Sequence, residues 1–542
     1  MVKTHSIYCL KNRVLSIILL LPVWFGGVAN SADLWQQAQA NRDAMRFSTL
    51  FTAQDVRDFL AQPDSLQEAV QWCKDTAVTH VYLEVFRGNY TADRDVLLNA
   101  KKKFQEEGIE VSGCITTTNI GRDSVNGWIF PCFSDSKSLE TLKRVFTYSA
   151  SLFDEVMIDD FFATGCECED CKKAKGERSW DDFRCDMLVD VSKRFVIDPA
   201  RQANPGVKII IKYPQWYDGF HSRGYEVVRQ SEMFDKIWVG TETRDPDSER
   251  WGRKAQYEAF FIMRWLGVLG GEKCGGGWFD PYGTSPKTYL EQARQTILGG
   301  AREALLFCYG SLVRSNGPEN IRALRDELPK LFDLAKIVRG KEIRGIHAPK
   351  IPNSEGEGDR YIYDFIGMLG LPLKPAVEID PDAPAAFLPY HSLKDDQLAK
   401  KLGQMLADQK PVLVTKRLAE KLPLSLKEQL DDSMILDVPD DFWDLMNLPE
   451  ERLGAMRRAL LAPFGLEFDA PTRVALYMFG DDVYGIENFN DAEIKAVLRK
   501  KSAKTQLSPL LCLPESSGFI SAAPGKAEIA VPARGLMIVK MN

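Results

Sequence analysis

Short apolar runs alternate with longer amphipathic segments from residue 46 to about residue 337. The short runs have the length of buried strands, and the longer segments carry apolar residues at the three- and four-residue spacing of a helix with one buried face. Turn-forming residues separate helix from strand, as in the Asn-Pro-Gly at 204–206. The pattern predicts strands at 46–52, 80–86, 109–117, 153–159, 207–213, 234–240, 275–280 and 303–310, and helices near 64–76, 93–107, 138–150, 181–202, 222–232, 253–268, 286–300 and 317–337.

Eight strand–helix pairs in this order are what a (β/α)8 barrel needs. A doubly wound open sheet is the alternative, but no G-x-G-x-x-G fingerprint follows any predicted strand. The sequence therefore predicts an α/β fold whose first domain, residues 32–341, is a (β/α)8 TIM barrel.

The pattern changes after residue 341. Shorter strand–helix units, with helices at 394–408 and 416–430, predict a small open α/β (flavodoxin-like) domain at 342–465. Beyond it, short alternating runs separated by Gly, Pro and Asn predict a C-terminal antiparallel β-domain at 466–542.

Residues 1–31 have the layout of a secretory signal peptide. Three cationic residues lie before the apolar run at 14–28, and small residues around Ala29 and Ser31 follow it. A retained membrane anchor is the alternative, but the run is short and contains Pro22 and two glycines. We therefore expect a secreted or periplasmic protein without a membrane span once the signal peptide is removed.

Composition and charge exclude several functions. Hydrophobic residues make up 45% of the chain and charged residues 27%, which is typical of a packed globular protein. The formal net charge is −7 and becomes more negative without the cationic leader, which argues against nucleic acid as a partner. The chain has only five histidines, which argues against a Ser-His-Asp triad or a three-histidine metal centre.

The most informative segment is VMIDDFFATGCECEDC at 156–171. A buried strand cannot hold the unpaired charges of Asp159 and Asp160, so this pair must lie at the strand's end. In a TIM barrel, the carboxyl ends of the strands form the mouth at which chemistry takes place. Polar or aromatic residues close the other predicted strands as well: Glu84, Thr116, Lys212, Tyr213, Trp216, Thr241, Glu242, Arg244, Trp278, Asp280 and Tyr309.

The predicted order of barrel, α/β domain and β-domain resembles that of bacterial β-galactosidases with a trimerisation-like α/β domain and a β-tail. The I-D-D-F-F motif at 158–162 is similar to the fourth-strand motif of a set of exported bacterial glycoside-hydrolase-like barrels. No Asn-Glu dipeptide ends the fourth strand, so the acid/base assignment of the galactosidases does not transfer. The resemblance implies a glycoside hydrolase with a carbohydrate substrate, and allows an oligomer formed through 342–465.

Glycoside hydrolysis needs two carboxylates in unlike protonation states. We predict that Asp160 is the ionised carboxylate, because strand alternation would turn Asp159 to the other face. Lys212 would favour the charged form of whichever aspartate faces it. Glu242 is the predicted proton donor by analogy with enzymes that resemble α-galactosidases, and Asp280 is the alternative. The predicted substrate-binding residues are Glu84, Lys212, Tyr213, Trp216, Arg244, Trp278 and Tyr309, with Phe161, Phe162, Tyr217 and Tyr282 as further aromatic candidates.

A structural ion-pair network that braces the rim is the alternative interpretation of these charges, and plain packing is the alternative for each aromatic residue.

The cysteines allow two arrangements of equal weight. Cys166, Cys168 and Cys171 are too close in sequence for mutual disulfides, and their spacing is typical of zinc ligands, with Cys185 or Cys132 as the fourth. Disulfides to Cys132 or Cys185 are the rival in an exported protein, and free thiols come third. Catalysis itself is expected to need no cofactor, so a zinc ion would be structural.

Three classes of function remain. An exported glycoside hydrolase acting on a polysaccharide or oligosaccharide ranks first. A barrel that binds glycans without cleaving them, or serves as a scaffold, ranks second. Another carboxylate- or metal-assisted hydrolase or lyase ranks third.

Overall fold

The computed structural model describes residues 31–125, 129–501, 507–515 and 519–541. The predicted signal peptide lies outside these residues except for Ser31, so the signal peptide and the export that it implies stay predictions. Within the described ranges, no helix is long and apolar enough to cross a membrane.

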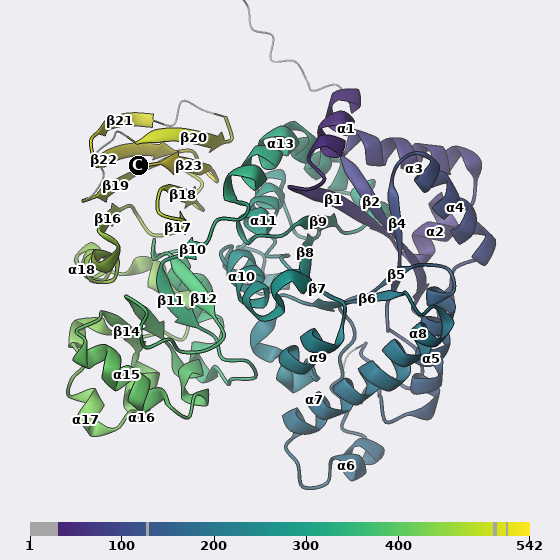
Figure 1. Cartoon of the computed structure of the whole chain (residues 1–542), viewed down its shortest axis with the longest axis horizontal. Helices are drawn as coiled ribbons and strands as arrows, with labels where there is room; N and C mark the ends of the chain where they lie inside the picture. Colours follow the sequence, from purple (N-terminus) through teal and green to yellow (C-terminus); the bar gives the residue numbers. More distant parts are fainter. Residues whose placement is uncertain (1–30, 126–128, 502–506, 516–518, 542) are drawn as a thin grey trace, which may run out of the picture.

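Eight parallel strands close into a barrel, which confirms the predicted fold class (Figure 1). The ring closes because β1 pairs in parallel with both β2 and β9. A two-residue strand, β3 (Tyr90–Thr91), adds to β2 in antiparallel orientation. The barrel strands are β1 (Arg46–Phe51), β2 (Val78–Arg87), β4 (Glu110–Ile115), β5 (Glu155–Ile158), β6 (Lys208–Tyr213), β7 (Lys236–Gly240), β8 (Cys274–Phe279) and β9 (Glu303–Leu306).

Helices surround this ring, and several of them begin where a side chain caps the first turn. Asp93, Asp135 and Ser285 each accept a hydrogen bond from a backbone N–H of the helix that follows. The helices of the barrel region are α1 (Ser31–Ala40), α2 (Ala53–Phe59), α3 (Pro63–Asp75), α4 (Arg94–Glu106), α5 (Ser136–Ala150), α6 (Glu169–Lys175), α7 (Trp180–Val191), α8 (Asp198–Ala203), α9 (Val227–Met233), α10 (Glu258–Gly270), α11 (Pro286–Leu298), α12 (Tyr309–Leu312) and α13 (Gly317–Val338).

One difference from the predicted helices matters for the site. The helix expected from residue 253 begins only at Glu258, because residues 245–257 form a loop with one short 3-10 turn after β7. This loop lies at the barrel mouth and contributes Trp251 to the cavity described below.

The barrel interior is filled by one side chain from each strand: Leu50, Tyr82, Cys114, Met157, Ile210, Trp238, Trp278 and Leu305. Side chains two positions further along a strand point the same way, so Glu84, Thr116, Asp159 and Lys212 also face inward, one step closer to the mouth. The prediction that Asp159 turns to the other face is therefore wrong. Gly276 leaves room for the indole of Trp238, which would lie 3.0 Å from a Cβ at that position.

The chain after the barrel forms a parallel sheet and two antiparallel sheets. The five-stranded parallel sheet has the order β12-β11-β13-β14-β15 and fits the predicted small α/β region. Its strands are β11 (Ile346–Pro349), β12 (Leu373–Ala376), β13 (Ala386–Leu388), β14 (Val412–Thr415) and β15 (Ile435–Leu436), with helices α14 (Ile362–Gly367), α15 (Leu398–Ala407), α16 (Lys416–Lys421), α17 (Leu424–Lys427) and α18 (Glu450–Leu461).

The antiparallel sheets have the orders β10-β17-β18-β23-β20 and β16-β19-β22-β21. Their strands are β10 (Ile343–Arg344), β16 (Leu466–Asp469), β17 (Val474–Phe479), β18 (Val483–Asn488), β19 (Ile494–Lys500), β20 (Ser508–Leu513), β21 (Phe519–Ala523), β22 (Lys526–Val531) and β23 (Leu536–Lys540). Since β10 pairs with β17, the segment after the barrel joins the antiparallel sheet before the parallel one begins. The domain boundaries at 341/342 and 465/466 stay predictions.

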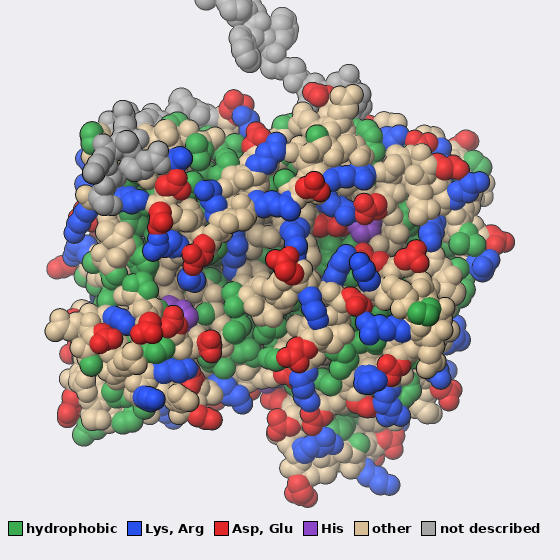
Figure 2. All heavy atoms as spheres, viewed as in Figure 1, with side chains coloured by type: hydrophobic (Ala, Val, Ile, Leu, Met, Phe, Trp, Pro, Cys, Tyr) green, Lys and Arg blue, Asp and Glu red, His purple; other side chains and the backbone are tan. Residues whose placement is uncertain are grey.

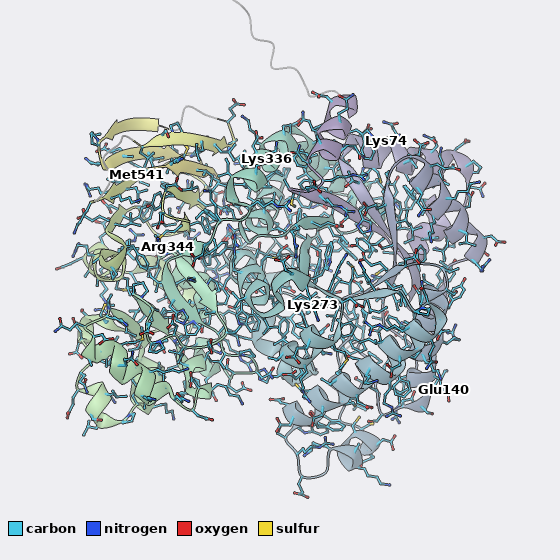
Figure 3. The ribbon with its side chains drawn as sticks, in the orientation of Figure 1. Lys74, Glu140, Lys273, Lys336, Arg344 and Met541 are labelled. Carbon is cyan, nitrogen blue, oxygen red and sulfur yellow. The ribbon has the colours of Figure 1, made fainter. Side chains whose placement is uncertain are left out.

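The C-terminal sheets pack against the side of the barrel formed by α10, α11 and α13 (Figure 1). Glu140 on the barrel and Met541 after β23 mark opposite sides of the molecule in Figure 3. Buried hydrogen bonds join the two parts: the indole of Trp265 donates to the carbonyl of Lys350 at 2.7 Å, and the Tyr217 hydroxyl donates to Asp364 at 2.9 Å. On the face drawn in Figure 2, acidic and basic side chains are interspersed.

Candidate active site

A cavity of about 730 Å³ opens at the carboxyl ends of the barrel strands. It is lined by residues at or after the carboxyl ends of all eight barrel strands, as expected of a TIM-barrel mouth. Seven of the predicted site residues line it: Asp160, Lys212, Trp216, Glu242, Arg244, Trp278 and Asp280.

Asp159 lies below the cavity and is fully paired. Lys212 donates to its Oδ1 at 2.6 Å, Arg87 donates to its Oδ2, and the Thr116 hydroxyl lies 3.0 Å from Oδ2. Although burial alone would raise the pKa of Asp159, the charges of Lys212 and Arg87 hold it below its ordinary value. Lys212 thus faces Asp159 rather than Asp160, and Asp159 is the ionised aspartate of the pair.

Glu84 completes this buried network. Its Oε2 accepts from Arg87 Nε at 2.7 Å and from the backbone N–H of Ala53 at 2.8 Å, and Thr116 is also within hydrogen-bond reach. Glu84 has no exposed surface and does not line the cavity. It holds Arg87 in place rather than binding substrate.

Asp160 follows β5 by two residues and lines the cavity. Its backbone carbonyl accepts from the Tyr225 hydroxyl at 3.0 Å, which fixes the main chain at this position. Burial and the adjacent charge of Asp159 raise the pKa of Asp160 to about 7. The two adjacent aspartates therefore differ: one is committed to the interior network and the other titrates near neutral pH.

Glu242, after β7, is a weakly compensated carboxylate of the mouth. Its Oε2 is buried and has no hydrogen-bond partner in the part of the chain that the structure describes, and its Oε1 lies 3.8 Å from Arg244 Nη2. Burial and the charges of Asp280 and Asp160 raise the pKa of Glu242 well above its ordinary value. Its surroundings therefore favour the protonated form of Glu242.

Asp280 and Arg244 form a bidentate pair next to Glu242. The guanidinium donates to the two carboxylate oxygens at 3.0 and 2.6 Å. Arg244 has a φ of +60°, a left-handed conformation uncommon in residues with a side chain, and its N–H donates to Gln292 at 3.2 Å. Gln292 in turn donates to the carbonyl of Asp280 at 3.1 Å. With both oxygens bound, Asp280 is placed to orient Arg244.

Aromatic rings form much of the cavity wall. The Lys212 ammonium lies 3.8 Å from the centre of the Trp278 ring, and the Arg244 guanidinium lies 4.1 Å from that of Trp251. Phe161 and Trp216 also line the cavity.

Four predicted aromatic residues do not reach the cavity. The hydroxyl of Tyr213 lies 3.3 Å from Ser231, and Tyr309 stacks on Phe51 at a ring-centre distance of 4.5 Å. Tyr217 is buried at the contact with Asp364, and Phe162 packs against Phe133. These residues stabilise the fold around the site.

Sequence reasoning missed other lining residues. Arg87 ends β2 three positions after Glu84. Side chains three positions apart on a regular strand point to opposite faces, so the sequence did not indicate that both reach the same site. Trp251 and Arg250 belong to the loop that was predicted partly as helix. The cavity also includes Asp55, Phe130, Phe307, Arg314 and Asn316.

The cysteine cluster lies in the loops after β4 and β5. The sulfur atoms of Cys132, Cys166, Cys168 and Cys171 all lie within 4.8 Å of one another. Cys185 lies elsewhere, with its thiol 3.5 Å from the carbonyl of His221, so the placement of Cys185 in the cluster is wrong and Cys132 takes that place. Every cysteine among the described residues is free, so the structure contains none of the expected disulfides within those ranges.

A closed barrel with a carboxylate-lined, aromatic-walled mouth is the architecture of many carbohydrate-active enzymes. Residues 32–351 match the family described as "Probable glycosyl hydrolase, catalytic domain", and the chain belongs to this family.

Individual relatives are more distant. A stretch of 354 residues is 27% identical to an uncharacterised protein of Saccharolobus solfataricus and covers 59% of this chain. The chain matches 58% of that relative's length, which is less than two thirds.

Among solved structures, an α-L-fucosidase isoenzyme 2 from Paenibacillus thiaminolyticus is similar over 92% of this chain and 99% of its own, with 12% identity and a TM-score of 0.62. An exo-β-1,4-mannosidase from an Opitutaceae bacterium covers 78% of this chain and 80% of its own, with 10% identity and a TM-score of 0.44. At 12% identity, the similarity to the fucosidase shows a shared fold.

Proposed function

We propose that the protein is an exported glycoside hydrolase that cleaves a polysaccharide or oligosaccharide with Asp160 and Glu242. The observation that carries this proposal is that two carboxylates, Asp160 and Glu242, line the same cavity and that the pKa of each is raised above its ordinary value. A glycosidase needs one carboxyl group that is protonated and one that is ionised at the same pH. Membership of the glycosyl hydrolase family supports the reaction class.

The surroundings of the two carboxylates suggest their roles. Asp160, with a pKa of about 7, is partly ionised at neutral pH and acts as the nucleophile or as the base that activates water. Glu242 keeps its proton and gives it to the leaving oxygen. Asp280 was the alternative donor, but Arg244 binds both of its oxygens, which favours Glu242.

The cavity wall fits a sugar ring. Trp216, Trp251 and Trp278 line the same space as the carboxylates, and aromatic rings can stack on the C–H faces of pyranose rings. Lys212, Arg244 and Arg250 supply hydrogen-bond donors for hydroxyl groups. The carbohydrate substrate is inferred from these groups and from the family.

The test is a screen of the mature protein against aryl glycosides and plant, algal and bacterial glycans, with reducing-end release as the readout. The α-L-fucosides come first because the α-L-fucosidase from Paenibacillus thiaminolyticus is similar in fold over most of the chain. On any substrate that is cleaved, Asp160→Asn and Glu242→Gln should each lower kcat by about 10³-fold or more. Glu249→Gln is the matched control, because Glu249 is exposed in the same loop as Trp251 and does not line the cavity.

Two outcomes would favour the other classes of function. Glycan binding without turnover, unchanged in Asp160→Asn, would indicate a binding barrel or scaffold. Activity that disappears with chelators and is absent on every glycoside would indicate a metal-assisted hydrolase or lyase.

Export and assembly belong to the same proposal. N-terminal sequencing of the protein from a cell fraction outside the cytoplasm should begin near residue 32, whereas an intact leader in the cytosolic fraction would contradict export. Association through residues 342–465 stays a prediction that light scattering would test.

A further inference from the structure

Four thiols from two neighbouring barrel loops converge on one point. Cys132 comes from the loop after β4, and Cys166, Cys168 and Cys171 come from the loop after β5 and the start of α6. Cys132, Cys166 and Cys171 are buried, and Cys168 is half-buried. Cys132 is separated from the other three along the chain, so only the folded barrel brings the four together.

The spacing of the sulfur atoms is that of a tetrahedral metal site. Zinc–thiolate bonds of about 2.3 Å in a tetrahedron place the sulfur atoms about 3.8 Å apart. Cys132 Sγ lies 3.8 Å from Cys168 Sγ and 3.7 Å from Cys171 Sγ. The two sulfur atoms of a disulfide lie about 2.0 Å apart. The sulfur–sulfur distances here are too long for such a bond, and Cys132 has two sulfur neighbours, whereas a disulfide joins only one pair.

The surroundings suit a negatively charged cluster. Four thiolates around one divalent cation carry a net charge of about −2. Arg122 Nη2 lies 3.5 Å from Cys132 Sγ and 3.4 Å from Cys168 Sγ, and it is held by Asp170 at 2.7 Å. A donor that contacts two ligands from outside is the usual second layer of a metal site.

We propose that Cys132, Cys166, Cys168 and Cys171 bind one structural zinc ion, which fastens the loop after β4 to the loop after β5. Four protein ligands close the coordination sphere, so the ion has no open position for substrate and does not take part in bond cleavage. Thiolates select soft or borderline cations over magnesium and calcium. The inference does not depend on the proposed glycosidase activity.

The four cysteines of the proposed zinc site lie in loops that also line the cavity. The loop after β4 carries Phe130 and the loop after β5 carries Asp160 and Phe161, and the rings of Phe130 and Phe161 have centres 6.4 Å apart. The Thr164 hydroxyl also ties these loops by donating to the carbonyl of Pro131 at 3.0 Å. Zinc at this point would hold one wall of the cavity in position relative to the other.

The test is metal analysis of the full-length mature protein purified without chelator or affinity metal. We expect one zinc per chain, released when an organomercurial titrates the thiols, and Co²⁺ exchange should give the intense thiolate-to-cobalt absorption of a tetrahedral four-sulfur site. Cys132→Ser and Cys168→Ser should each lower zinc content at least tenfold, whereas Cys185→Ser should retain one zinc per chain.

Native mass spectrometry of the wild-type protein keeps the test decisive if the cluster variants do not fold. A mass excess of one zinc supports the site. A metal-free chain with all four thiols reactive, a disulfide within the cluster, or iron in place of zinc would each overturn the proposal. Zinc that persists after loss of Cys132 but not after loss of Cys185 would move the site away from this cluster.

Discussion

Asp159 and Glu242 are both buried near the barrel mouth, but only the surroundings of Asp159 stabilise a negative charge. Asp159 is bound by Lys212, Arg87 and Thr116, which lowers its pKa despite burial. Glu242 has one oxygen without a hydrogen-bond partner among the described residues, and burial raises its pKa. Buried polar atoms in native proteins are normally satisfied, so an unsatisfied carboxylate in a cavity indicates a group kept free for a ligand. The comparison separates a carboxylate that stabilises the site from one that is available for proton transfer.

Among the variants that test this comparison, Asp159→Asn should have the largest effect, a loss of stability. The variant leaves the buried charges of Lys212 and Arg87 without their shared partner, and breaking a buried ion pair in this way costs roughly 3–5 kcal/mol. Urea denaturation would measure the loss in the free energy of unfolding. The double variant Asp159→Asn/Lys212→Met should recover part of it, and a single variant as stable as the wild type would show that the network is dispensable.

Gly240→Ala should displace the Glu242 side chain and have a smaller effect than Asp159→Asn. A Cβ at this position would lie 3.0 Å from Glu242 Oε2 and 2.7 Å from the backbone nitrogen of Gln215. A small displacement of the proton donor can reduce turnover by roughly 10- to 100-fold. Steady-state kinetics should show the loss in kcat, with an unchanged circular dichroism spectrum. Gly267→Ala is the control, because nothing lies within 4 Å of a Cβ at that half-buried helical position.

The pH dependence of kcat/KM should report the ionisation of Asp160 and Glu242, and the effect of the Asp159 charge on Asp160. Since the pKa of Asp160 is about 7, kcat/KM should rise with pH through that value as Asp160 loses its proton, and fall at higher pH as Glu242 loses its own. In any folded Asp159→Asn protein, the lower limb should move to lower pH by roughly one unit, because the repelling charge is gone. An unmoved limb would assign it to another group.

Stability should follow pH with opposite signs at the two aspartates. The pKa of Asp159 is lowered on folding, so its contribution to stability is present above the ordinary Asp pKa and is lost as the pH falls below it. The pKa of Asp160 is raised, so its contribution is present in acid and is lost as the pH rises through about 7. The melting temperature of wild type and Asp160→Asn across pH 4–9 would check the second sign.

The smallest effect should come from Trp251→Ala. A stacking contact with a sugar ring is worth about 0.5–1.5 kcal/mol, so KM should rise roughly 3- to 10-fold while kcat changes little. Trp251 is only half-buried, so the free energy of unfolding should stay near that of the wild type. A fall in kcat with constant KM would show that Trp251 instead positions Arg244, which lies over its ring.

The barrel could be predicted because the strands are largely buried on both faces and most of the helices on one, and these two patterns are easy to tell apart. Burial on both faces of the strand also explains why the orientation of Asp159 could not be predicted. Val156, Met157 and Ile158 are all apolar and fully buried, so alternation along β5 does not reveal which of them faces inward. The interior position of Met157 fixes the orientation only once the ring has closed.

The candidate site could be predicted in part, because residues at strand ends must meet at the mouth of a barrel. The fourth cysteine could not, since Cys132 and Cys185 lie on either side of the C-x-C-x-x-C segment and only the path of the loop after β4 favours Cys132. Trp251 was missed for a different reason. Its loop has neither helical nor strand periodicity, and its position depends on contacts from far along the chain.

One such contact limits how the protein can be divided into parts. The loop that carries Trp251 is braced from the C-terminal region, where the indole of Trp443 donates to the carbonyl of Arg253 at 3.0 Å. A protein cut back to residues 32–351, the part that matches the family, would lose this brace and would expose Tyr217, whose partner Asp364 lies beyond the cut. The region after the barrel therefore supports the cavity rim from outside, and a barrel transplanted without it would keep the cavity-lining carboxylates but lose the support of that rim.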